Sequence, residues 1–82
     1  MTRILYFGRV AERLGAESSL DLPADGASMG EIRNLLAARD EVAADALLRV
    51  DVRACLDQVV VRDDVRARPG QEIAFFSIFS GG

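Results

Sequence analysis

The apolar residues in the first quarter of the chain follow the periods of a strand, a short helix and a second strand. Residues 2–8, TRILYFG, are mostly apolar and β-prone, which predicts a first strand. In the following RVAERLG segment, Val10 and Leu14 lie four residues apart and Gly15 comes next, which predicts one or two helical turns. Residues 18–26 predict a short strand closed by a proline-containing turn. We therefore expect a two-stranded hairpin whose connection holds the short helix.

The central segment carries the best helix signature. Ser28 and Glu31 have the S-x-x-E spacing of a capping box, in which each side chain satisfies a backbone amide at the helix start. The apolar residues that follow at helical spacing are Met29, Ile32, Leu35 and Leu36. This is the main helix of the prediction, although Gly30 inside it costs about 1 kcal/mol relative to alanine. Residues 41–48 either extend this helix or form a second one, and the pattern leaves both open.

After residue 48 the apolar pattern becomes that of strands. Residues 52–56 and 59–61 are strand-like, and the polar pair Asp57-Gln58 between them suits a tight hairpin. Cys55 lies between two apolar residues of the first of these strands, so we expect it to be buried and structural.

The last predicted strand is residues 72–76, EIAFF, which follows a turn at residues 68–71, RPGQ. Two pairs alternate between the faces of this strand, Ile73 with Phe75 and Ala74 with Phe76. If Phe75 faces the core, Phe76 therefore faces outward.

The composition is that of one small folded domain. At 82 residues the chain supports a single core, and half of its residues are apolar. No apolar run approaches the roughly 20 residues of a membrane span, and the start lacks the features of a signal peptide, so we expect a cytoplasmic protein. A single cysteine leaves no intrachain disulfide and no thiolate set for zinc.

Two residue types that commonly carry chemistry are missing. The sequence has no histidine, which excludes the Ser-His relay and the commonest metal ligand. All ten cations are arginines, which excludes a Schiff-base lysine and a Walker-type lysine. The net charge of −3 opposes nucleic-acid binding, and the mixed charges of residues 62–68, RDDVRAR, predict a solvated loop. We expect no bound cofactor and no metal.

The C-terminal carboxylate is the reactive group that such a chain presents without steric cost. Gly81 and Gly82 lack Cβ atoms, so the end can pass through a narrow channel of a partner. A carboxylate resists acyl transfer until its oxygen becomes a good leaving group, for which ATP-dependent adenylation is the usual route. Replacement of the adenylate by sulfur gives a nucleophilic thiocarboxylate. The tail would then be a substrate.

Hairpin, main helix and further strands form an α+β layout with one main helix on one sheet face. With this ending it resembles the β-grasp (ubiquitin-like) fold, a mixed sheet of four to five strands, and in particular the small subunits of molybdopterin synthase, sulfur carriers of molybdenum-cofactor biosynthesis. The resemblance rests on ILYFGRVAERLG at residues 4–15, PGQEIAFF at residues 69–76 and the final Gly-Gly. Where that family often has prolines, this chain has Ser77 and Ile78, which removes a conformational restraint from the tail.

The resemblance implies a β-grasp domain at residues 1–76 and a flexible tail at residues 77–82. Gly82 would carry the acyl adenylate and then the thiocarboxylate, with Gly81, Ser80 and Phe79 inserted into the partner. An adenylating enzyme related to ubiquitin activators would use the ATP. The large subunit would supply the catalytic residues that transfer sulfur to the pterin precursor, in a heterotetramer. The chain itself is then a non-catalytic sulfur-carrier subunit.

Aromatic residues beside the tail are candidates for the partner interface. Phe75, Phe76 and Phe79 together exceed what one sheet face buries, so we expect Phe75 inside and the other two against the large subunit. Phe7 is a weaker candidate, and it shares a strand face with Arg3, which indicates exposure.

Two alternatives remain. The same tail would serve a sulfur carrier of thiamin, cysteine or tungsten-cofactor synthesis, or a protein-modifying system, although thiamin carriers are usually shorter. The other alternative is a ubiquitin-like interaction module with a chemically silent tail.

Overall fold

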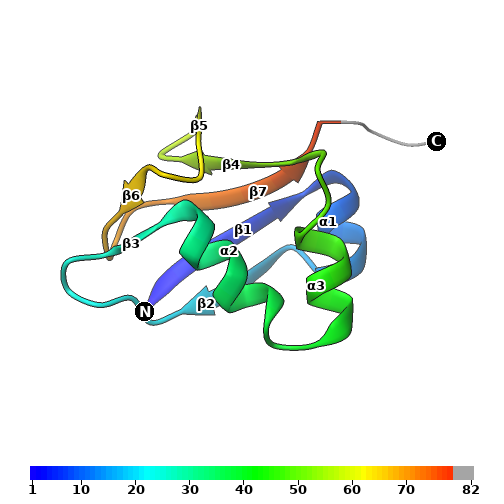
Figure 1. The fold of residues 1–82 in the computed structure, drawn as a ribbon, viewed down its shortest axis with the longest axis horizontal. Coiled ribbons are helices and arrows are strands. Elements are labelled where there is room, and N and C mark those ends of the chain that lie inside the picture. Colours follow the sequence, from blue (N-terminus) through cyan, green and yellow to red (C-terminus); the bar gives the residue numbers. More distant parts are fainter. Residues whose placement is uncertain (79–82) are drawn as a thin grey trace.

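A five-stranded mixed sheet forms the body of the protein in the computed structural model, which describes residues 1–78 (Figure 1). Strands β1 (Thr2–Phe7) and β2 (Glu17–Leu20) form the expected antiparallel hairpin. Strand β7 (Ile73–Ser77) lies parallel to β1 and antiparallel to β4 (Val52–Leu56), and β5 (Val59–Val61) pairs with the other side of β4. The order is β2-β1-β7-β4-β5, so the last strand is central.

Three helices cover one face of this sheet (Figure 1). Helix α1 (Gly8–Leu14) lies in the β1–β2 connection and ends at Gly15, as expected. The main helix is α2 (Met29–Ala37), and α3 (Glu41–Leu47) follows it. Strands β3 (Ala27–Ser28) and β6 (Arg66–Ala67) form a separate two-stranded sheet. The result is an α+β β-grasp fold, as expected, and no helix within residues 1–78 is long and apolar enough to cross a membrane.

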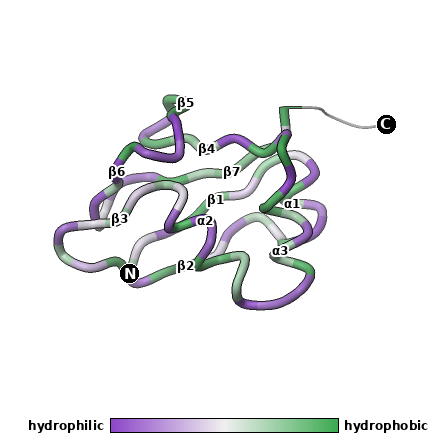
Figure 2. Tube along the Cα trace, in the orientation of Figure 1, coloured by the Kyte–Doolittle hydropathy of each residue, from purple (hydrophilic) through white to green (hydrophobic). Residues whose placement is uncertain are grey.

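The core lies between the helices and the inner sheet face. Its largest side chains are those of Phe75, Ile4, Met29, Ile32, Leu36, Leu47 and Ile73, which are all almost completely buried. Figure 2 shows apolar residues concentrated along β1 and β7, the two strands that cross the centre of the sheet. Burial of Ile73 and Phe75 confirms the predicted inner face of the last strand.

One residue of the predicted helical stripe does not reach the core. Leu35 is 50% exposed, whereas the other members of the stripe are buried. At 3.6 residues per turn Leu35 lies roughly 90° from the mean direction of that stripe, whereas Arg33 lies only roughly 70° from it. The helix therefore turns Arg33 inward in place of Leu35, and the side chain of Arg33 is only 11% exposed.

Local side-chain hydrogen bonds set the start of α2 and of α3. The predicted capping box is present, with the Ser28 amide 3.0 Å from Glu31 Oε1 and the Glu31 amide 3.1 Å from Ser28 Oγ. These bonds lower the pKa of Glu31. Asp40 caps a second helix by accepting a 2.7 Å hydrogen bond from the Ala43 amide, which resolves the open question about residues 41–48.

The glycine inside α2 has a packing reason. A Cβ at Gly30 would lie 3.2 Å from the Cβ of Asp63, and the Gly30 amide donates to the Asp63 carbonyl at 2.9 Å. The neighbouring chain therefore approaches the helix more closely than a side chain comfortably allows.

Residues 62–68 differ from the predicted solvated loop. Arg66–Ala67 form β6, and Ala67 is completely buried although most of the charged residues around it are exposed. The Met29 amide also donates to the Val65 carbonyl at 2.9 Å. The charged residues on either side obscured Ala67 in the sequence, and the pairing of β6 with β3 buries it. By contrast, the Asp57-Gln58 hairpin is as predicted, with both residues at positive φ.

Candidate functional site

The middle strand of the sheet carries the chain towards the predicted tail. Ser77 is the final residue of β7, one residue beyond the strand expected from the sequence, and Ile78 is the last residue described. Because β7 is hydrogen-bonded to β1 on one side and β4 on the other, the chain leaves from the centre of the sheet. The predicted site residues Phe79, Ser80, Gly81 and Gly82 lie outside the described residues, so their roles stay predictions.

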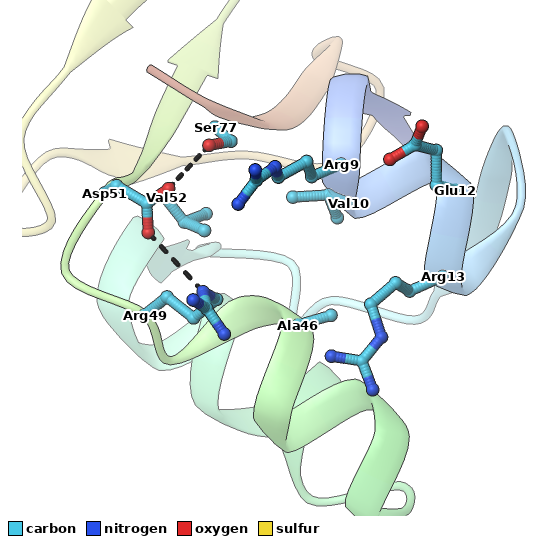
Figure 3. A pocket seen from close by; sticks show the side chains of 9 residues that line it. All are labelled: Arg9, Val10, Glu12, Arg13, Ala46, Arg49, Asp51, Val52 and Ser77. Carbon is cyan, nitrogen blue, oxygen red and sulfur yellow. Dashed lines mark hydrogen bonds and ion pairs between the residues drawn. The ribbon is translucent and has the colours of Figure 1, made fainter. Parts of the chain in front are cut away.

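A cleft of about 210 Å³ lies beside this exit, between α1, the end of α3 and the end of β7 (Figure 3). Three arginines line it, namely Arg9 and Arg13 from α1 and Arg49 from the segment after α3. Arg13 forms an ion pair with Asp45 of α3, which lowers the pKa of that carboxyl. The cleft therefore joins two helices and the exit strand, with charged side chains from α1 and from the segment after α3.

Asp51 connects the cleft to the exit strand. Its Oδ2 accepts a 2.6 Å hydrogen bond from Ser77 Oγ, and its backbone carbonyl accepts a 2.9 Å bond from the Ile78 amide. Arg49 Nε lies 3.7 Å from the other carboxylate oxygen (Figure 3). The Ser77 hydrogen bond lowers the pKa of Asp51, as do the charges of Arg49 and Arg9, against the raising effect of burial. No signal in the sequence pointed to Asp51, because residues 26 positions apart meet only in the folded sheet.

The sheet face away from the helices carries the two aromatic residues predicted for the interface. The β1–β7 register places Phe7 opposite Phe76, and the β4–β7 register places Arg53 on the other side of Phe76. Phe7 is 52% exposed and Phe76 is half-buried, so both face outward as expected. The structure thus brings together two residues that are far apart in sequence, although their contact with a partner stays a prediction.

A second row of apolar residues lies on the same sheet face. Leu5, Ala74, Cys55 and Val60 lie opposite one another across β1, β7, β4 and β5, and Ala74 among them is buried. We call these four residues together with Phe7 and Phe76 the open face. Cys55 is half-buried here instead of buried as expected, because it faces away from the core, and desolvation raises the pKa of its thiol. The alternation of side chains along β4 could have indicated this placement.

Metal binding gains no support from the described part of the chain. Within residues 1–78 no three histidine, cysteine, aspartate or glutamate side chains are grouped so as to hold a metal ion.

Known proteins resemble this chain over its full length. The sequence profile of the ThiS family matches residues 4–82. The molybdopterin synthase sulfur carrier subunit of Escherichia coli (strain K12) is 30% identical over 82 residues, which cover 100% of both chains. Among solved structures, SAMP1 from Haloferax volcanii superposes with a TM-score of 0.70 at 19% identity, covering 99% of this chain and 98% of that chain. Another crystal structure of small archaeal modifier protein 1 from H. volcanii gives 0.72 at 17% identity, covering 93% and 94%.

Proposed function

Because the chain belongs to the ThiS family, we propose that it is the sulfur carrier subunit of a molybdopterin synthase and that the carboxylate of Gly82 carries the sulfur. The observation that carries the proposal is the full-length 30% identity to the E. coli sulfur carrier subunit. Transfer of sulfur in thiamin, cysteine or tungsten-cofactor synthesis is the alternative within the same chemistry.

The proposed chemistry has two steps on the chain end. The Gly82 carboxylate oxygen attacks the α-phosphorus of ATP on an adenylating enzyme, a P–O bond forms, and pyrophosphate leaves. A sulfide donor then attacks the acyl carbon, a C–S bond forms, and AMP leaves with the carboxylate oxygen. The product is a thiocarboxylate. On the large subunit its sulfur attacks the pterin precursor, a C–S bond forms and an oxygen leaving group departs. Water then cleaves the acyl–sulfur bond, which leaves the sulfur on the pterin and restores the Gly82 carboxylate. This chain supplies the acyl group, and the partners supply the catalytic residues and the ATP site.

The described structure supports a division of labour between body and tail. The body within residues 1–78 has no histidine or lysine and no cluster of three candidate metal ligands, which suits a passive carrier. The open face, by contrast, carries Phe7 and Phe76 beside the exit of the chain. Exposed aromatic side chains of this kind anchor protein interfaces. We infer that the open face docks on the large subunit while Phe79, Ser80, Gly81 and Gly82 enter its active site, as in a heterotetrameric synthase.

Intact mass spectrometry tests the proposal directly. The chain is incubated with ATP, sulfide and an adenylating enzyme related to ubiquitin activators. We expect a mass gain equal to the exchange of one oxygen for one sulfur, and no gain in a variant lacking Gly82 or in a reaction without ATP. An unchanged mass of the full chain under all conditions would contradict a sulfur carrier and favour the silent interaction module. Addition of the large subunit and the pterin precursor then separates the molybdenum pathway from the alternatives.

A further inference from the structure

Asp51 holds both of the last two described residues through different groups. Its side chain accepts the hydrogen bond from the Ser77 hydroxyl, and its main-chain carbonyl accepts the hydrogen bond from the Ile78 amide. The second bond continues the antiparallel β4–β7 ladder one step beyond Val52, the first residue of β4. A single residue therefore fixes the point at which the chain leaves the sheet.

Asp51 is itself well anchored. Its side chain is only 14% exposed, it lies in the cleft between α1 and the end of α3, and Arg49 approaches its carboxylate. Arg9 reaches into the same space from α1 (Figure 3). The residue that follows, Val52, is buried in the core. Contacts from β7 and from the segment after α3 therefore hold this carboxylate, and Arg9 of α1 lies in the same cleft.

We propose that Asp51 is a positioning residue that fixes the point and direction in which the chain leaves the sheet, so that Ser77 and Ile78 are already ordered when the chain binds the adenylating enzyme. This proposal rests on the proposed sulfur-carrier function. We call the hydrogen bonds from Ser77 and Ile78 to Asp51 the clamp. When the clamp is lost, Ser77 and Ile78 become ordered only on binding.

The cost of ordering two further residues falls on binding and not on the chemical step. Fixing a residue's backbone is unfavourable, and partial fixing of two residues weakens productive binding by roughly tenfold. The Gly82 carboxylate that reacts is the same in either case. We therefore expect a KM effect with little change in kcat for adenylation.

The test uses the full chain and the same adenylating enzyme. Asp51→Ala and Ser77→Ala each remove the side-chain bond but keep the carbonyl that accepts from Ile78, so amide exchange of Ile78 reports whether the side chain braces the exit. In both variants we expect the amide exchange rate of Ile78 to rise. We also expect the KM of the adenylating enzyme for this chain, measured by pyrophosphate release, to rise about tenfold. Because the two residues share one contact, the effect of the double variant should be smaller than the sum of the effects of the two single variants.

Matched controls separate positioning from general damage. Asp45→Ala removes a carboxylate that pairs with Arg13 in the same cleft without touching the exit strand, and it should leave both readouts unchanged. Asp51→Asn keeps an acceptor oxygen and Ser77→Thr keeps a hydroxyl. In both variants, Ile78 exchange and KM should therefore lie closer to the wild-type values than in the alanine variants. Equal melting temperatures of all variants exclude unfolding as the cause.

Each contrary outcome is decisive. Unchanged Ile78 exchange in Asp51→Ala overturns the clamp, and raised exchange with unchanged KM overturns its role in activation. If the wild-type chain releases no pyrophosphate and gains no sulfur, the proposed function fails and the role of Asp51 in activation fails with it. The Ile78 exchange data, which need no partner, distinguish that failure from the absence of a clamp.

Discussion

Replacement of Arg33 by methionine should destabilise the fold more than any other arginine substitution in the described chain. Arg33 Nη1 donates to the carbonyls of Leu47 and Val52 at 3.2 and 3.0 Å, and Nη2 lies 2.9 Å from Asp63 Oδ1. Its guanidinium carbon lies 5.5 Å from the ring centroid of Phe75. One side chain therefore ties α2 to the end of α3, the start of β4 and the loop before β6.

The magnitude follows from these contacts. Two carbonyls that lose a charged donor cost about 1–1.5 kcal/mol each, towards the lower end of the range because neither site is fully sealed from water. Loss of the contact with the Phe75 ring adds about 0.5–1 kcal/mol. The ion pair with Asp63, whose side chain is 56% exposed, contributes less than about 1 kcal/mol. The total is about 3–4 kcal/mol, a large part of the stability of so small a domain.

Urea unfolding followed by circular dichroism measures this loss. Arg33→Met should lower the free energy of unfolding by about 3–4 kcal/mol with an unchanged m-value. Arg33→Lys should lose about half as much, because an ammonium cannot reach all three acceptors at once. Arg39 is a matched control, since it also bonds a side chain and a carbonyl, at Ser18 and Ser19, but it does so at the surface. If Arg33→Met costs no more than Arg39→Met, our account of Arg33 as an inward-facing bracket is wrong.

Three further predictions follow from the site and the fold. Phe7→Ala together with Phe76→Ala should weaken binding to the large subunit by at least tenfold in calorimetry while the melting temperature stays close to that of the wild type, and equal affinity would argue against docking by the open face. The folded-state pKa of Asp51 is lowered, so its ionised carboxylate contributes fully to stability above the ordinary aspartate pKa and loses that contribution as the pH falls through the lowered pKa. An NMR titration of Asp51 should therefore show a pKa below the ordinary aspartate value, and this pKa should rise in Ser77→Ala. Gly26→Ala should cost several kcal/mol in thermal unfolding, because Gly26 has φ +82° and a Cβ there would lie 2.0 Å from a β6 carbonyl oxygen, and a loss below about 1 kcal/mol would contradict this reasoning.

The features that the sequence predicted correctly depend on neighbours in the chain. The capping box of Ser28 and Glu31 and the hairpin at Asp57-Gln58 are local chemistry, so spacing alone identified them. The outward direction of Phe76 followed from strand alternation once Phe75 was assigned to the core.

The features that were missed depend on contacts between distant segments. The inward direction of Arg33 is favourable only because its guanidinium donates hydrogen bonds to carbonyls of α3 and β4. Burial of Ala67 in β6 needs β3 as its partner, and the charges around it hid this pairing. The Asp51–Ser77 contact likewise exists only after β4 and β7 have paired. Pattern analysis has no access to such pairings, because many registers fit the same alternation.

The central place of β7 has a consequence for when the chain can fold during its synthesis. Within the described chain β7 is both the strand made last and the strand that joins the β1–β2 hairpin to the β4–β5 hairpin. Until β7 has been synthesised, no strand joins the two hairpins, and the core lacks the buried side chain of Phe75. A chain that ends before residue 73 lacks this central strand, so we expect it to remain unfolded. Synthesis of β7 is therefore the step at which we expect the domain to become folded.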